Sequence, residues 1–211
     1  MIVEHFPVGM LHCNCVILGD EVTKRAIIVD PGDDVDRIEA AVSKHGFTVA
    51  AIVATHAHID HVGGLARLKA VTGAPALLHE ADLELYKDLA EQARWLGVPA
   101  PPVATIDGFL ADGQRVEFGA SGMDVLHTPG HSPGSVTFVG PGPLPLVLSG
   151  DTLFAGSIGR TDLWGGSFET IMKSLRERLL ALPDGCEVIC GHGPMTTIGR
   201  ERSTNPFLTE V

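Results

Sequence analysis

Short apolar runs alternate along this chain with longer segments in which apolar residues recur at helical spacing. The runs are rich in β-branched residues, have the length of strands and end at glycine, proline or aspartate. They predict strands over residues 13–19, 25–30, 47–55, 74–79, 114–119, 123–128, 135–140, 144–150 and 186–191. The helical spacing predicts helices over residues 33–46, 61–73, 80–97 and 167–183.

The order of these elements indicates the fold class. Strands open the chain, strands and helices then alternate, and further strands precede a last helix and strand. An α/β chain of this order is expected to form an αββα sandwich, in which two mixed β-sheets are flanked by helices. The Pro-rich stretch 98–108 is expected to be a rigid surface connector, and residues 196–211 are expected to be irregular.

Charge and hydrophobicity narrow the classes of partner. Asp and Glu number 26 against 15 Lys and Arg, a formal net charge of −11, which disfavours nucleic acid. No run of about 18 apolar residues is present to span a membrane. The N-terminus lacks the basic start and apolar run of a secretory signal, so we expect a cytoplasmic protein. Its cysteines should then be reduced and structural: Cys13, Cys15, Cys186 and Cys190.

Metal-type residues follow four of the predicted strands. His56, His131, Asp151 and His192 each come just after a strand and lie close to glycine or proline. Loops at the carboxyl ends of strands can converge on one edge of a sandwich. We therefore expect these four side chains to belong to one site.

The stretch "ATHAHIDHVGG" adds further candidate ligands. His56 and His58 leave one loop on the same side, and Asp60 and His61 supply a second position where the next helix begins. Glycines at 63–64 let that helix start close to the ions. One ion held by histidines and another held by mixed His and Asp make a two-metal site. Water between two cations becomes hydroxide near neutral pH and can attack a polarised carbonyl.

The other histidines have no comparable context. A single histidine on a loop is usually a polar surface residue. His127 lies four residues before His131 and is as consistent with a support for that ligand as with a surface position. Ordinary polar positions are expected for His5, His12, His45 and His79.

At these residues the sequence resembles the metallo-β-lactamase superfamily. "THAHIDHVGG", "HTPGHSPGS", "SGDTLF" and "GHGP" match its motifs in order and over almost the whole chain. The resemblance implies that fold and two divalent metal ions, with zinc expected and iron or manganese as alternatives. It implies one ion held by His56, His58 and His131, a second held by Asp60, His61 and His192, and Asp151 bridging both. Asp60 and His58 are also the expected catalytic residues.

Two longer segments resemble the glyoxalase II branch of this superfamily. "GDTLFAGSIGRTDLWGG" and the tail "GHGPMTTIGRERSTNPFL" are most similar to stand-alone hydrolases of that kind, which cleave thioesters such as S-lactoylglutathione. The resemblance implies a single domain over residues 1–211, without the C-terminal helical domain of glyoxalase II. It implies a small-molecule thioester or ester as the partner and leaves the oligomeric state open.

Arg160 is the candidate substrate-binding residue. In glyoxalase II a lysine and a tyrosine near this place touch glutathione, and here Arg160 and Asp162 stand near those two positions. Arg160 could bind a substrate carboxylate, or it could pair with Asp162 in a structural turn. The identity of the thiol therefore stays open at this point.

Other activities share parts of the pattern. "GRTDL" also resembles persulfide dioxygenases, in which a single iron is held at positions like His56, His131 and Asp151. A lactone or ester hydrolase would share the metal motif. A non-catalytic metal-binding protein would have lost a ligand, and none of the expected ligands is missing. The late "GHGP" and the additional ligands favour the dinuclear hydrolase.

Overall fold

The computed structural model describes residues 1–209 and divides them into two compact units. The N-terminal unit comprises Met1–Leu110 and Glu117–Gly122. The C-terminal unit comprises Ala111–Val116 and the chain from Met123 onward. Each unit carries part of the predicted ligand set.

The first sheet belongs to the N-terminal unit. Its strand order is β1-β2-β3-β4-β5-β6, antiparallel from β1 to β3 and parallel from β3 to β6. The bounds are β1 Ile2–Val8, β2 Cys13–Gly19, β3 Arg25–Val29, β4 Thr48–Val53, β5 Ala76–His79 and β6 Gly108–Leu110. Strands β2, β3 and β4 are largely buried, as their continuous apolar runs predict.

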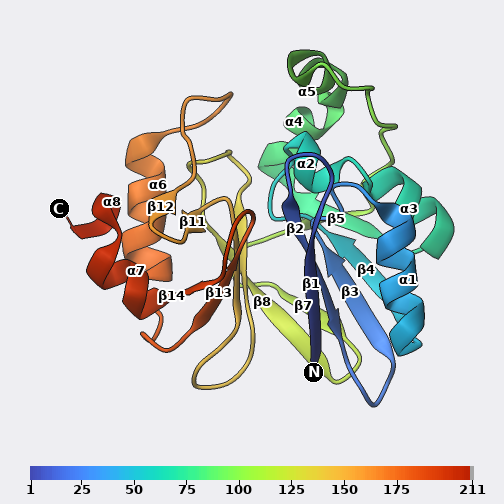
Figure 1. Ribbon diagram of the computed structural model, residues 1–211, viewed down its shortest axis with the longest axis horizontal. Helices are drawn as coiled ribbons and strands as arrows, with labels where there is room; N and C mark the ends of the chain where they lie inside the picture. Colours follow the sequence, from blue (N-terminus) through green and yellow to red (C-terminus); the bar gives the residue numbers. More distant parts are fainter. Residues whose placement is uncertain (210–211) are drawn as a thin grey trace. The chain divides into compact units, whose positions relative to one another are not determined.

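Short helices accompany this sheet. They are α1 Val35–His45, α2 Ile59–Val62, α3 Leu65–Thr72, the 3-10 turn η1 Glu80–Asp82, α4 Leu83–Lys87 and α5 Leu89–Leu96. Helix α1 buries Val35, Ile38 and Val42 on one face and ends at Gly46, whose φ of 66° is left-handed. Figure 1 shows α1 and α3 side by side against the sheet.

A second six-stranded sheet has the order β14-β13-β10-β9-β8-β7. Its strands are β7 Arg115–Phe118, β8 Ser121–His127, β9 Val136–Val139, β10 Val147–Gly150, β13 Glu187–Cys190 and β14 Thr196–Thr197. The β10–β13 pair is parallel, whereas β8–β9, β9–β10 and β13–β14 are antiparallel. A separate hairpin joins β11 Leu153–Phe154 to β12 Ser157–Ile158.

The C-terminal unit also contains four helical segments. They are α6 Phe168–Ser174, the π-helical turn η2 Leu175–Leu179, α7 Ile198–Thr204 and α8 Pro206–Thr209. Ser167 caps α6, because its hydroxyl accepts the backbone N–H of Thr170. Ile171 and Leu175 pack with Val147 and Val188 in the apolar core of this unit.

Three predictions made from the pattern are corrected by the structure. The single helix predicted over 80–97 is η1, α4 and α5, with a break at Asp88. The helix predicted over 61–73 is α2 and α3, separated at Gly63 and Gly64. The irregular tail predicted over 196–211 is wrong through Thr209, because β14, α7 and α8 occupy it. Residues 210–211 lie outside the described chain.

Other predictions are confirmed. Two mixed sheets flanked by helices are present, and every predicted strand is observed. All four cysteines are buried and none forms a disulfide. Among residues 1–209, the helices are too short or too polar to cross a bilayer.

Candidate metal centre

The loop that follows β4 carries four of the predicted ligands. Strand β4 delivers the chain to His56, and α2 begins directly after His58. The His56 ring lies edge-on to the ring of His58, with centroids 4.8 Å apart, and 4.0 Å from that of His61. His56 and His61 are buried, while the Asp60 side chain is 17% exposed. The loop therefore combines nitrogen ligands inside the fold with a carboxylate that solvent can reach.

Asp30, which follows β3, fixes the orientation of two of these histidines. Its carboxylate accepts the backbone N–H and the hydroxyl of Thr55, each at 2.7 Å. The Thr55 oxygen then accepts the Nδ1–H of His56 at 3.1 Å, and Asp30 accepts the Nδ1–H of His61 at 3.0 Å. These bonds leave the Nε2 lone pair of each ring for a metal ion. Sequence analysis missed Asp30, although its place at a strand end was a usable signal.

Cys13 also contacts the ligand His61. Its Sγ lies 3.4 Å from His61 Nδ1, and the thiol is fully buried. Burial raises the pKa of the Cys13 thiol to about 12, so it stays protonated at neutral pH. The structural role of Cys13 is therefore to pack against the ring of His61, which is a predicted ligand.

The C-terminal unit holds its three predicted ligands on three separate loops. His131 Nδ1 donates to the carbonyl oxygen of Arg160 at 2.8 Å, which leaves Nε2 as its metal-binding nitrogen. That Nε2 lies 3.6 Å from Asp151 Oδ2, and His192 Nε2 lies 3.7 Å from the same oxygen. Ligand atoms about 2.1 Å from one tetrahedral ion lie about 3.4 Å apart, so this spacing suits shared coordination.

The ring of His127 supports the loop around His131 by a bond to the backbone of that loop. The Nε2–H of His127 donates to the carbonyl oxygen of Pro133 at 2.9 Å. Ser132 and Ser135 close the same loop, with the Ser135 hydroxyl oxygen accepting the Ser132 N–H at 3.0 Å. Of the two alternatives left open for His127, the structure favours a support for the ligand loop.

Two glycines pack directly on the carbonyl oxygens of the predicted aspartate ligands. A Cβ added at Gly32 would overlap the carbonyl oxygen of Asp60, and one added at Gly159 would overlap that of Asp151. No larger residue fits either position without moving the ligand backbone. In each unit, the carbonyl oxygen of a predicted aspartate ligand therefore packs against a glycine, which has no side chain.

A buried carboxylate organises the segment after His192. Glu201 on α7 is fully buried and accepts three bonds: from the hydroxyl of Thr196, the backbone N–H of Gly156 and the amide of Asn205. Gly156 lies in the β11–β12 hairpin that follows Asp151. One side chain thus joins the segment after His192 to the segment after Asp151.

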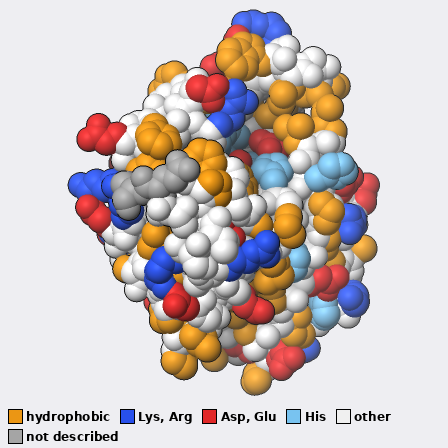
Figure 2. Space-filling model, turned by 60° about the vertical axis from the view of Figure 1, so that its left-hand side comes forward, with side chains coloured by type: hydrophobic (Ala, Val, Ile, Leu, Met, Phe, Trp, Pro, Cys, Tyr) orange, Lys and Arg blue, Asp and Glu red, His pale blue; other side chains and the backbone are white. Residues whose placement is uncertain are grey.

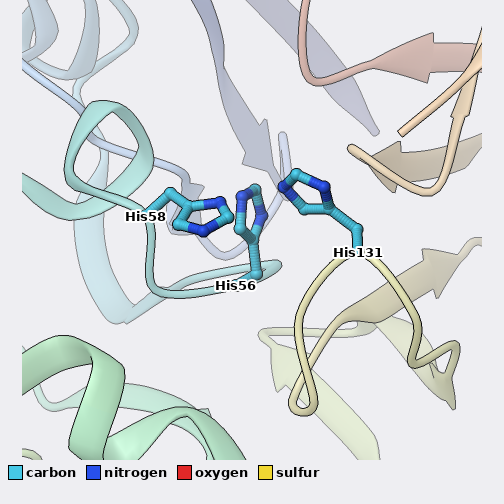
Figure 3. Close-up of side chains that lie close together, drawn as sticks. All are labelled: His56, His58 and His131. Atoms are coloured by element: carbon cyan, nitrogen blue, oxygen red, sulfur yellow. The ribbon is translucent and has the colours of Figure 1, made fainter. Parts of the chain in front are cut away.

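Ligand-type atoms also lie close together within the N-terminal unit. One ligand atom each of Cys13, Asp30 and His61 lies within 4.8 Å of the others. Figure 3 shows the rings of His56 and His58 side by side on the loop after β4, and the ring of His131 on a loop of the C-terminal unit. The nitrogen and carboxylate donors of the predicted ligand sets fit zinc, iron or manganese.

Arg160 pairs with Asp162 in a turn, which is one of the two roles predicted for it. Its guanidinium pairs in bidentate fashion with Asp162, at 2.7 and 2.8 Å, on the surface. The hydrogen bonds that Arg160 donates hold the pKa of Asp162 down to about 2. Because the pair is exposed, its net contribution to stability is small. The pairing does not test whether Arg160 also binds substrate.

Comparison with known proteins decides the family. The model of the metallo-β-lactamase superfamily matches residues 8–192. The chain belongs to this superfamily. It is a metallo-hydrolase of that group, and the expected fold class is confirmed.

Two relatives of this superfamily member match over nearly their full lengths. Hydroxyacylglutathione hydrolase GloC of Haemophilus influenzae is 37% identical, over 99% of this chain and 98% of that protein. The probable metallo-hydrolase YqgX of Bacillus subtilis is 37% identical, over 97% and 96%.

Solved structures agree with this assignment. BLEG-1 B3 metallo-β-lactamase has a TM-score of 0.91 at 36% identity and covers 99% of this chain and 100% of its own. TTHA1623 in a di-iron-bound form has a TM-score of 0.86 at 42% identity, covering 96% and 98%. ETHE1 from Myxococcus xanthus has a TM-score of 0.81 at 26% identity, covering 98% and 84%.

Proposed function

We propose that this protein is a dinuclear metal-dependent hydrolase that cleaves a thioester of the S-lactoylglutathione type. The observation that carries the proposal is its end-to-end likeness to the Haemophilus influenzae hydroxyacylglutathione hydrolase, together with an undiminished ligand set. The likeness to a B3 metallo-β-lactamase supports the shared hydrolytic chemistry. A thiolate leaves a thioester without prior protonation, whereas a lactam nitrogen needs a proton as it leaves.

The proposed metal sites use the ligand sets described above. His56, His58 and His131 would hold one ion, Asp60, His61 and His192 the other, and Asp151 would bridge them. When bound, the two ions activate a water molecule and polarise the substrate carbonyl. Zinc stays our expectation, and the di-iron form of TTHA1623 supports iron as the alternative.

The side chains then have distinct tasks in the proposed reaction. The water oxygen forms a bond to the thioester carbon, the C–S bond breaks, and the sulfur leaves as a thiolate. We assign the proton released by the water to the second oxygen of the Asp60 carboxylate, because the first is assigned to the metal ion. His58 orients the reacting groups as a ligand. Protonated Asp60 then returns the proton to solvent or to the departing thiolate.

Arg160 is proposed to bind a carboxylate of the substrate by exchanging its bond to Asp162. Arg160→Ala should raise KM for carboxylated thioesters and leave KM for uncharged thioesters unchanged. Steady-state kinetics with both substrate classes measure this, with Arg115→Ala as the control because Arg115 forms a similar exposed pair with Asp124. A change confined to thermal stability would favour the turn as its only role.

The decisive experiment is hydrolysis of S-D-lactoylglutathione by the zinc-loaded protein. The wild type should turn over, His58→Ala should lose at least about 100-fold in kcat, and the His5→Ala control should not change. His5 is an exposed histidine on β1 and suits the control. Absence of turnover would contradict the thioesterase. Oxygen uptake by iron-loaded protein on glutathione persulfide would then support the dioxygenase, and lactone opening the ester hydrolase.

Three further expectations remain part of this proposal. The partner is a small molecule, the protein acts in the cytoplasm, and residues 1–211 act as one domain. Figure 2 shows basic and acidic side chains interspersed on one face, which suits a small ligand better than a nucleic acid.

A further inference from the structure

The side chain of Gln92 holds the backbone on both sides of His58. Gln92 lies on α5, and its Oε1 accepts the backbone N–H of Ile59 at 2.8 Å. Its Nε2 donates to the carbonyl oxygen of Ala57 at 3.2 Å and to that of Leu85 at 2.9 Å. One amide group therefore fixes the residues before and after a predicted metal ligand.

These bonds replace a helix cap that the sequence of the loop does not provide. His58 is the N-cap residue of α2, and its side chain makes no capping bond. The first N–H groups of a helix have no partner within the helix and need an external acceptor. Gln92 provides that acceptor for Ile59.

Asp82 completes the support from the same side of the loop. Its side chain is fully buried, and its Oδ2 accepts the backbone N–H of Ala57 at 3.0 Å. Ala57 stands between His56 and His58, so its N–H and its carbonyl oxygen are both held by side chains. Gln92 holds the peptide groups on both sides of His58 and Asp82 holds the one before Ala57, and together these bonds set the direction in which the His58 side chain leaves the backbone.

We propose that Gln92, assisted by Asp82, is a positioning residue for His58 and so sets the affinity of the metal ion that His58 binds. Gln92 acts through the backbone of Ala57 and Ile59, to which its side chain is bonded. Its effect on catalysis rests on the proposed function, whereas its effect on metal binding does not. Supports that orient metal ligands typically contribute 10- to 100-fold in affinity.

The test compares two substitutions of Gln92 with one of Gln114. Gln92→Met keeps the volume and removes all three bonds. Gln92→Glu keeps the shape and the acceptor for Ile59, but it places a carboxylate oxygen against the two carbonyl oxygens. Gln114→Met is the matched control, because Gln114 Oε1 accepts one backbone N–H, that of Ala111, at 2.9 Å.

Each variant is titrated with Co²⁺, and the visible spectrum of the bound ion reports ligand geometry. Both Gln92 variants should bind one Co²⁺ about 10- to 100-fold more weakly with an altered spectrum, while the control matches the wild type. Unchanged affinity and spectrum, with only a lower melting temperature, would overturn the proposal. If thioester hydrolysis is absent in the wild type but Co²⁺ affinity falls in the variants, the positioning role stands and the proposed function fails.

Discussion

The two units present metal ligands in opposite ways. In the N-terminal unit, four predicted ligands lie within six consecutive residues, His56 to His61, which run from the loop after β4 into α2. In the C-terminal unit, His131, Asp151 and His192 are separated by 20 and 41 residues and come from three loops. A single segment can set the geometry of the first group. The second group depends on how distant strands pair.

The groups that hold the predicted ligands in place also differ between the two units. Side chains hold the N-terminal loop, with Asp30, Asp82 and Gln92 bonded to its backbone or its rings. In the C-terminal unit the His131 ring is held by a backbone carbonyl, that of Arg160. A side-chain support can be removed by one substitution. A backbone support can be changed only by moving the chain that carries it.

Replacing Asp151 should have the largest effect and tests the C-terminal group directly. Asp151→Ala removes the oxygen that lies 3.6 and 3.7 Å from the Nε2 atoms of His131 and His192. We expect loss of at least one metal ion per chain and a fall in kcat of more than about 100-fold. Elemental analysis and kinetics measure both, with Asp124→Ala as the control. Retention of both ions would refute the bridging role.

Replacing Asp30 should have the next largest effect and tests the side-chain supports of the N-terminal loop. Asp30→Ala removes the acceptor for His61 and for the Thr55–His56 chain, so both rings lose their fixed orientation. Metal affinity should fall about 10- to 100-fold, measured by competition with a chelator. The exposed Asp36, replaced by alanine, is the control. Equal affinity in both variants would show that the loop holds its rings without Asp30.

Glu201 offers a way to disturb the C-terminal unit without touching a ligand. Glu201→Ala leaves the buried donors of Thr196 and Asn205 and the backbone N–H of Gly156 without their acceptor and should cost roughly 3 kcal/mol of unfolding free energy. Glu201→Gln should cost only about 1 kcal/mol, because its amide oxygen can still accept from Gly156 and Asn205. Urea unfolding measures both. A loss no greater than that of the exposed control Glu177→Ala would contradict this account.

Asp20 gives the smallest expected effect, on stability in acid. The backbone N–H groups of Ala120, Val22 and Thr23 hold the pKa of Asp20 down to about 2. Its contribution is therefore complete above the unfolded-state pKa of about 4 and is lost as pH falls toward 2. The difference in urea midpoint between wild type and Asp20→Asn should shrink from pH 6 to pH 3. A constant difference would show that the charged form is not preferred in the fold.

The bonds of Asp20 show that the N-terminal unit does not depend on local sequence spacing alone. Asp20 bonds Ala120, one hundred residues along the chain, although both belong to the N-terminal unit. Local spacing therefore explains the ligand loop of that unit but not its whole framework. Loss of the acid dependence in Asp20→Asn would show that this distant bond contributes to the stability of the unit.

Hydrophobic pattern predicted the buried strands well and the helices less well. Continuous apolar runs such as β2 and β3 are buried on both faces, so composition alone marks them. The break at Asp88 was not predicted because Leu85, Tyr86 and Leu89 are buried on both sides of it. The apolar spacing therefore continues across Asp88, where α4 ends and α5 begins.

The C-terminal tail shows a different limit. Helix α7 buries only Ile198 and Glu201, so its apolar pattern is almost absent. The helix starts at Thr197, whose hydroxyl oxygen caps the N–H of Arg200, and a buried carboxylate fastens it. The cap was the usable signal. The candidate ligands could be picked out because metal chemistry restricts residue type, whereas Asp82 and Gln92 act through the backbone, which no spacing rule reveals.

The glycines beneath the two aspartate ligands have a consequence for engineering this protein. A library that seeks a new metal preference would normally vary His, Asp and their neighbours. Gly32 and Gly159 would be poor positions to include, because any side chain there would displace the carbonyl of Asp60 or Asp151. Diversity in such a library belongs in the ligand side chains and their supports. Gly32 and Gly159 should therefore be kept as glycine in such a library.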